Sequence, residues 1–344
     1  MFIAADTLDD LLRRAFDKIL RDGIRVKASR GTNKELGSIL LRLTNPLARL
    51  SHTEKRGKIF SALGELAWYL SGRKDANFIT PYIDRYKEEA EEDGTIYGAY
   101  GPRMFSREGE SQFDSIIALL RNKPTSRQAV IQLFGADDLR GAHKDVPCTC
   151  SLQFMVRARR LNMVAVMRSN DAYFGLPHDI FSFTMIQELA ARKLGCEVGV
   201  YSHFAGSLHI YDDYLDAARK YIGEGWQDRE YAAMPPMPAG DPWPSVLVWL
   251  EAEEAIRAGR APGKRRLDRL GDYWGDLARL LQVHFLYKEK KSSEIDDIKG
   301  KMSSAVYREY ISQKAKPKRS APKSGQPALP FAGELGNDDQ GDQS

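Results

Sequence analysis

Cys148 is the residue whose surroundings most clearly suggest chemistry. It follows Pro147 in the segment DVPCTCSLQF, and the β-forming residues after it indicate a cysteine at the edge of a strand. Arg168 comes about one strand length later, so a neighbouring antiparallel strand would bring its guanidinium near the sulfur. A nearby cation lowers the pKa of a thiol and favours the nucleophilic thiolate. The alternative is that Cys148 is a buried small apolar residue, the usual state of a free cysteine.

The composition favours a globular protein that binds a small anion. The chain has 344 residues, of which 42% are hydrophobic, enough for one large domain or one domain with appendages. Its 51 basic and 47 acidic residues leave a net charge of +4, too weak to indicate nucleic-acid binding but compatible with a nucleotide phosphate. Three cysteines in all, with Cys148 and Cys150 as a lone C-x-C, predict neither a disulfide framework nor a structural zinc site. With no signal peptide and no run of 18 apolar residues, we expect a cytoplasmic protein.

Secondary-structure patterns predict one sheet with several covering helices. Thr7 would cap an amphipathic helix over 7–23, and Gly195 would close a helix over 181–195. A second, largely buried helix is expected within 55–72, and another over 212–223. Strands are expected in the runs 25–46, 126–135, 151–171 and 196–211, with loops near 30 and near 159.

The character of the chain changes after about residue 224. We expect a catalytic core over 1–223 and a helical C-terminal extension over 224–313 that packs on the core. The extension opens with the Pro-rich loop MPPMPAGDPWP and contains helices over 245–259 and 268–288. Residues 314–344 are rich in Lys, Pro, Ser, Gly and Asp and predict a disordered tail, within which ALPFAG is either unstructured or a docking segment.

Several motifs together resemble one enzyme family. RSNDAYFGLPHDI, with PC upstream and GSLHIY downstream, resembles thymidylate synthases and pyrimidine hydroxymethylases over roughly residues 8–220. GELAWYLSG, DGTIYGAYGPR and SRQAVIQLF are similar to further segments of that family. The resemblance implies an α/β (α+β) thymidylate synthase-like fold, with a bent mixed sheet at a homodimer interface, surrounded by helices, and active sites shared between subunits.

The resemblance also implies substrates and residue roles. The substrates would be a pyrimidine nucleoside monophosphate and 5,10-methylenetetrahydrofolate, with no metal. Cys148 would attack C6 of the base, which makes C5 nucleophilic toward the folate-borne carbon. Glu65, supported by Tyr97, would transfer protons to and from the base through ordered water. Asp171 and Gly175 would bind the pterin ring of the folate. The remaining roles are phosphate binding by Arg30, Arg168, Ser169 and, across the subunit interface, Arg127, and sugar binding by His209 and Tyr211.

Two departures from thymidylate synthases favour a cytosine substrate and a hydroxymethyl product. Asp179 in GLPHD replaces the Asn that reads uracil. A carboxyl group can accept a hydrogen bond from the 4-amino group of cytosine and, once protonated, can donate a hydrogen bond to N3. Phage dCMP hydroxymethylases resemble this chain in having Asp there. In thymidylate synthases a Trp shields the intermediate that carries an exocyclic methylene at C5, and Ile83 stands at that position here. Water rather than hydride would therefore capture the methylene.

Other departures keep alternatives open. Gln128, Thr149 and Ser207 replace an Arg, a His and an Asp of the family. The alternatives are a thymidylate synthase acting on dUMP, a non-catalytic nucleotide-binding module, and, from the basic tail segment KPKRSAPK alone, RNA binding. The sequence does not distinguish ribose from deoxyribose.

Overall fold

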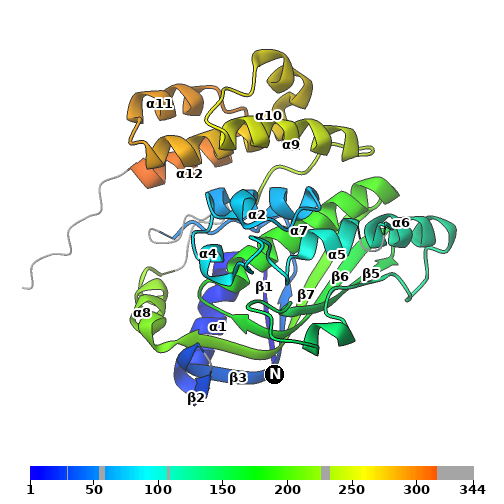
Figure 1. The fold of residues 1–344 in the computed structure, drawn as a ribbon, viewed down its shortest axis with the longest axis vertical. Helices are drawn as coiled ribbons and strands as arrows, with labels where there is room; N and C mark the ends of the chain where they lie inside the picture. Colours follow the sequence, from blue (N-terminus) through cyan, green and yellow to red (C-terminus); the bar gives the residue numbers. More distant parts are fainter. Residues whose placement is uncertain (29, 54–58, 107–108, 226–232, 316–344) are drawn as a thin grey trace, which may run out of the picture.

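A seven-stranded mixed sheet forms the centre of the computed structural model, which describes residues 1–28, 30–53, 59–106, 109–225 and 233–315 (Figure 1). The strands follow the order β1-β3-β7-β6-β5-β4, with β2 paired to β3. The pairs β1/β3 and β6/β7 are parallel and the others antiparallel. The strand bounds are β1 Phe2–Ala5, β2 Ile24–Ala28, β3 Gly31–Leu43, β4 Val130–Gln132, β5 Thr149–Arg157, β6 Arg160–Asp171 and β7 Glu197–Tyr211.

Irregular pairing interrupts the sheet at two places. The register shifts between Thr149 and Ser151 at the start of β5, and between Leu161 and Met163 in β6. Such bulges bend a strand and increase its twist. The first of them lies directly beside Cys148, so the sheet changes direction where the candidate nucleophile stands.

Two long helices cover one face of the sheet. They are α1, Leu8–Asp22, and α7, Gly175–Leu194. Thr7 caps α1 by accepting a hydrogen bond from the Asp10 amide, and Gly195 closes α7 in the left-handed conformation with φ of 64°, as predicted. The predicted turn near 159 is also confirmed, since Ala158 and Arg159, both with positive φ, join β5 to β6.

Shorter helices surround this layer. The predicted buried helix is α2, Ile59–Leu70, which packs on α7. The segment between it and β4 holds α3 Ala76–Ile79, α4 Tyr86–Glu89, α5 Tyr100–Phe105 and α6 Gln112–Asn122. The 3-10 helix η1, Ala136–Leu139, precedes β5, whereas η2 Asp212–Tyr214 and α8 Leu215–Gly223 follow β7.

The C-terminal region forms a separate helical layer over α2 (Figure 1). It consists of α9 Trp243–Arg257, α10 Lys264–Lys288, α11 Ser292–Gly300 and α12 Ala305–Ala315, with a kink in α10 at Gly271. Tyr82 donates to Glu253 at 2.7 Å, and the Ile59 amide donates to Tyr310 Oη at 3.0 Å, so side chains from both ends of this layer bind the core. Residues 316–344 of the expected tail lie outside the described part of the chain, and none of the described helices is long and apolar enough to cross a membrane.

Candidate active site

Cys148 lies at the bulged start of β5, beside Arg168 of β6. The Arg168 amide donates to the Cys148 carbonyl at 2.9 Å. The Arg168 guanidinium in turn donates to the carbonyls of Pro147 at 3.0 Å and Val146 at 2.9 Å. The antiparallel β5/β6 pairing expected from the sequence therefore brings Arg168 to the segment that carries Cys148.

The charge state of Cys148 differs from the sequence-based expectation. Burial raises the pKa of the Cys148 thiol to about 11, and the charges of Asp145 and Asp179 add to this increase. Arg168 and Arg30 lower the pKa, but their effect is smaller than that of burial. Arg168 thus lowers the pKa of the thiol as expected from the sequence, but burial, which the sequence did not reveal, outweighs this effect.

Tyr100, at the start of α5, is the tyrosine that lies beside Cys148. Its hydroxyl accepts a hydrogen bond of 3.1 Å from the Thr149 amide, and the charges of Cys148 and Asp179 both contribute to raising the Tyr100 pKa well above its usual range, after burial. Tyr97 instead stacks on His143, with ring centroids 3.4 Å apart, under the Arg103 guanidinium. The structure thus places Tyr100, rather than Tyr97, at the candidate site.

Glu65 of α2 is buried and held at both carboxylate oxygens. Tyr86 Oη donates to Oε1 at 2.9 Å, and His178 Nδ1 lies 3.0 Å from Oε2. The side chain is therefore not the exposed helix-surface charge that its position in α2 would also have allowed. The adjacent charge of Glu65 contributes to raising the pKa of Asp179, which shows that the two carboxyl groups lie near each other.

Asp179 lies in the second turn of α7 and is only 8% exposed. Burial is the first cause of a pKa raised well above the usual range, and the charge of Glu65 is the second. Asn170 Nδ2 donates to Asp179 Oδ2 at 2.6 Å and opposes the increase. The raised pKa favours the protonated form of Asp179 compared with an exposed carboxyl group, and Asn170 fixes Oδ2 as an acceptor.

Asp171 ends β6 and has one free oxygen. Its Oδ1 accepts from the amides of Tyr173 at 2.8 Å and Phe174 at 3.1 Å. Its Oδ2 is buried and has no hydrogen-bond partner among the described residues. Gly175 begins α7 at this point, and a Cβ there would lie 3.1 Å from Asn170 Nδ2 and 3.5 Å from Asp179 Oδ2. The absence of a side chain at Gly175 thus allows Asn170 and Asp179 to approach each other.

His209 and Tyr211 lie near the end of β7, next to the end of β6. Asp171 is the β6 partner of His209, and the two rings of His209 and Tyr211 meet edge to face at 5.0 Å. Burial lowers the pKa of His209, which favours the neutral ring, while the charges of Asp171 and Glu35 oppose this. Ser207 Oγ lies 3.3 Å from His209 Nδ1 and donates to Glu35 at 2.5 Å. Ser207 thereby links His209 to a carboxylate that stands on the neighbouring strand.

The expected phosphate-binding residues separate into two groups. Arg30 donates a hydrogen bond of 2.7 Å to Glu89. Its charge also lowers the pKa values of Cys148, Asp145 and Tyr211, so Arg30 lies near the thiol and Arg168. Ser169 follows Arg168 on β6. Arg127 is exposed, and its carbonyl accepts from Gln153 at 2.9 Å. Arg127 precedes the edge strand β4, away from the Arg30 and Arg168 pair in the sheet order.

Sequence reasoning missed several residues of this region. They are Tyr86, Tyr100, Asp145, Asn170 and His178. The available signals were local: Tyr100-Gly101 repeats Tyr97-Gly98 three residues later, Asp145 precedes Cys148 by three residues, and His178 directly precedes Asp179. Among the described residues, no cluster of three or more His, Cys, Asp or Glu side chains is suited to hold a metal ion.

Comparisons with known proteins agree with this arrangement. The sequence model of the thymidylate synthase family matches residues 12–235. Deoxyuridylate hydroxymethyltransferase of Pseudomonas phage M6 is 30% identical over 230 residues, covering 62% of this chain and 66% of the relative. The enzyme of the same name from Bacillus phage SP01 is 30% identical over 213 residues, covering 57% of this chain and 55% of the relative.

A solved structure shares the fold. Thermostable thymidylate synthase A from Bacillus subtilis superimposes with a TM-score of 0.56 at 25% sequence identity, covering 64% of this chain and 85% of that chain. The first curated relatives extend beyond the match, since this chain spans about two thirds of one and 55% of the next. The family match covers Glu65, Cys148, Asp171, Asp179 and His209. The chain belongs to the thymidylate synthase family.

Proposed function

We propose that this protein transfers a one-carbon unit from 5,10-methylenetetrahydrofolate to C5 of a pyrimidine nucleoside monophosphate, and that its product is a 5-hydroxymethyl cytidylate. One observation supports this most: the thiol of Cys148 and the carboxyl group of Asp179 both lie near Tyr100, and the doubly held Glu65 lies near Asp179. A nucleophile, a base-reading group and a proton carrier are the three parts that such a reaction needs.

Cys148 would supply covalent catalysis. C5 of a pyrimidine is a weak nucleophile, and addition of the sulfur to C6 converts it into an enamine-like carbon that can form a new carbon–carbon bond. The C5 hydrogen then leaves as a proton while the bond between the transferred carbon and the folate nitrogen breaks, which releases tetrahydrofolate and leaves an exocyclic methylene. Water adds to this methylene, and elimination of the sulfur from C6 restores the aromatic ring and gives the 5-hydroxymethyl product. Methylenetetrahydrofolate supplies the carbon at the oxidation level of formaldehyde. Because burial keeps the free thiol protonated, bound nucleotide must assist its ionisation.

Glu65 would carry protons to and from the base. Its carboxylate oxygens each have further lone pairs beyond those occupied by Tyr86 and His178, so it can also accept from an ordered water molecule near the ring. We propose that Tyr100 takes the role expected of Tyr97, since it lies between Cys148 and Asp179.

Asp179 supports cytosine as the base. The fixed acceptor Oδ2 can receive the 4-amino group, while the retained proton can be donated to N3. This pairing satisfies both polar groups of Asp179, and an unsatisfied partner in a buried site costs about 1–3 kcal/mol. Ile83, half-buried against the core, supports capture of the exocyclic methylene by water, because an aliphatic side chain covers less of it than an indole would.

The residues at the end of β6 suit the folate. Asp171 Oδ2 is a buried acceptor without a partner, and the pterin ring offers N–H donors of the kind that such an oxygen requires. Gly175 leaves room beside it. We therefore assign pterin binding to Asp171 and Gly175, whereas His209 and Tyr211 would bind the sugar hydroxyl.

The sheet supports a homodimer with shared sites. Leu161, Met163, Ala165 and Met167 of β6 face the helices and are fully buried, whereas the alternating residues Val164 and Val166 on the other face remain partly exposed. Phe204 and Leu40 extend this apolar face across β7 and β3. A second copy packed on this face would cover it and would allow Arg127 to join Arg30, Arg168 and Ser169 at the partner's phosphate.

Uridylate is the second candidate base. The two phage relatives are named deoxyuridylate hydroxymethyltransferases. A protonated Asp179 that accepts from N3–H and donates to O4 would also satisfy uracil. The deciding experiment incubates the full chain and methylenetetrahydrofolate with dCMP, CMP or dUMP and determines the product mass. A CH2O gain on a cytidylate is expected; methyl transfer to dUMP with dihydrofolate formation, or reaction of dUMP alone, would contradict the cytosine proposal.

A further inference from the structure

His178 connects the base-reading turn of α7 to Glu65. Its Nδ1 lies 3.0 Å from Glu65 Oε2, and its Nε2 lies 3.2 Å from Ser61 Oγ. His178 is 9% exposed and Glu65 5%. The imidazole therefore has a polar partner at each nitrogen within largely buried surroundings, and both partners stand on α2.

One tautomer of His178 fits both of its contacts. Because a carboxylate oxygen accepts hydrogen bonds, the ring that donates to Glu65 is the one with its proton on Nδ1. In the neutral ring Nε2 is then an acceptor, which the Ser61 hydroxyl satisfies as donor. Tyr86 donates to the opposite oxygen of Glu65 at 2.9 Å. Glu65 is thus held from α7 on one side and from α4 on the other, which restricts its carboxylate to one orientation.

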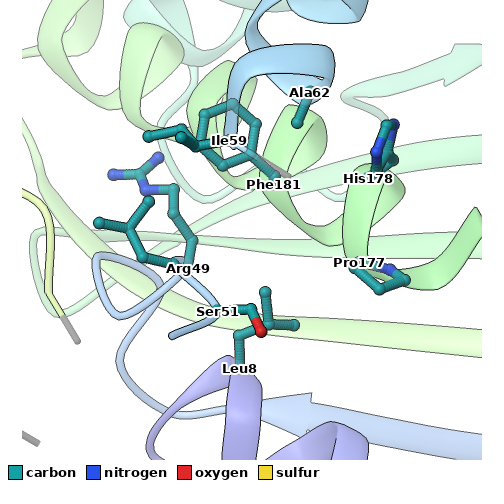
Figure 2. Close-up of a pocket in the computed structure, with 9 residues that line it drawn as sticks. Leu8, Arg49, Ser51, Ile59, Ala62, Pro177, His178 and Phe181 are labelled. Atoms are coloured by element: carbon teal, nitrogen blue, oxygen red, sulfur yellow. The ribbon is translucent and has the colours of Figure 1, made fainter. Parts of the chain in front are cut away.

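A small cavity borders His178 on its other side. It has a volume of about 20 Å³ and is lined by His178 together with Ala62, Pro177, Ser51 and five other residues (Figure 2). About one water molecule fits a space of this size. A ring slightly larger than imidazole can therefore be accommodated at position 178, so the loss of its nitrogens can be separated from a loss of packing.

We propose that His178 is a positioning residue that orients the Glu65 carboxylate for proton transfer at the pyrimidine ring. The inference rests on the proposed function and adds a residue to it. Because His178 and Asp179 are consecutive, the turn of α7 that reads the base also fixes the group that moves its protons. A base seated on Asp179 is thereby aligned with Glu65 by a single rigid element.

Two substitutions separate positioning from packing. His178→Phe keeps a ring but removes both nitrogens, whereas His178→Asn places an amide donor near the position of Nδ1. We expect His178→Phe to lower kcat roughly ten-fold to hundred-fold with nucleotide KM within about two-fold, because the lost interaction serves proton transfer rather than binding. His178→Asn should retain kcat within about three-fold of the wild type. His203→Phe is the control, a buried histidine bonded to Tyr201 at 2.9 Å, and should leave kcat within about two-fold.

A folate-free assay keeps the test independent of the product. Exchange of the C5 hydrogen of dCMP or dUMP for solvent deuterium requires sulfur addition and proton transfer only, and mass spectrometry of the nucleotide follows it. The exchange rates should rank wild type, then His178→Asn, then His178→Phe, in folded full-length proteins whose thermal unfolding is recorded alongside.

Four outcomes would overturn the inference. Equal rates for His178→Phe and His178→Asn would show that the Nδ1 donor is irrelevant, and a change in KM alone would assign His178 to nucleotide binding. Equal losses in His178→Phe and the His203→Phe control would indicate general damage to the fold. If the wild type exchanged the C5 hydrogen but formed no product with folate, the proposed one-carbon transfer would be refuted, while the exchange rates of the variants would still test the role of His178. If the wild type showed neither exchange nor product, the proposed function and this inference would be refuted together.

Discussion

The Arg168 amide donates a hydrogen bond of 2.9 Å to the carbonyl of Cys148, which fixes the guanidinium and the thiol at one end of the β5/β6 pair. Burial nevertheless raises the pKa of the Cys148 thiol to about 11, and Arg168 only limits the increase. The raised pKa therefore favours the protonated thiol at Cys148 in the unliganded protein. This preference is directly measurable.

Alkylation of Cys148 by iodoacetamide should accelerate with pH without reaching a plateau below about pH 10, because only the thiolate reacts. Arg168→Gln should slow the reaction further at a given pH, since Arg168 lowers the pKa. Peptide mass spectrometry separates Cys148 from Cys150 and Cys196, which serve as internal references. A plateau near pH 8 in the unliganded protein would contradict the raised pKa.

Asp179→Asn should shift the base preference toward uridylate. The amide nitrogen of Asn can only donate, whereas either oxygen of Asp179 can accept from the cytosine amino group, so we expect kcat/KM for dCMP relative to dUMP to fall about ten-fold to hundred-fold, which corresponds to roughly 1–3 kcal/mol. Steady-state kinetics with both nucleotides measure the ratio. An unchanged ratio would show that Asp179 does not read the base.

Local sequence signals predicted the framework of the site better than its chemistry. Thr7 and Gly195 cap their helices as expected, because capping depends on a few neighbouring residues. The choice between Tyr97 and Tyr100 depends on where α5 begins, and two Tyr-Gly pairs three residues apart leave that undecided. The pKa of Cys148 depends on burial by the assembled fold, which no local motif encodes.

Asp145 should make the stability of the protein decrease with pH over an acidic interval. Burial raises its pKa from 3.8 to about 6, with a further contribution from Glu89. Between these values the folded state holds a proton that the unfolded state has lost, so stability decreases as pH rises and is constant above about 6. Asp145→Asn should remove this loss, which is at most about 3 kcal/mol. Urea unfolding at pH 4 and pH 7.5 tests it, and a parallel pH dependence of the two proteins would contradict it.

The ion pair of Arg49 and Glu188 should stabilise the attachment of the C-terminal helices. Both side chains are fully buried, Glu188 also accepts from the Met237 amide at 2.6 Å, and the charges of both act on Tyr307 of α12. Within the part of the chain that the structure describes, Arg49 Nε and Nη1 have no hydrogen-bond partner, so removal of the carboxylate would leave a buried charge uncompensated. Glu188→Gln should therefore lower the free energy of unfolding by about 3–5 kcal/mol.

The double variant Arg49→Met with Glu188→Gln distinguishes a charge effect from a packing effect. Removing both charges eliminates the uncompensated ion, so the double variant should be more stable than Glu188→Gln alone by urea unfolding. Arg219→Met, which removes an exposed pair with Asp216 at 2.5 Å in α8, is the control for losing an arginine and should cost less. If the double variant were the least stable, the pair would hold α12 through packing of its aliphatic portions rather than through charge.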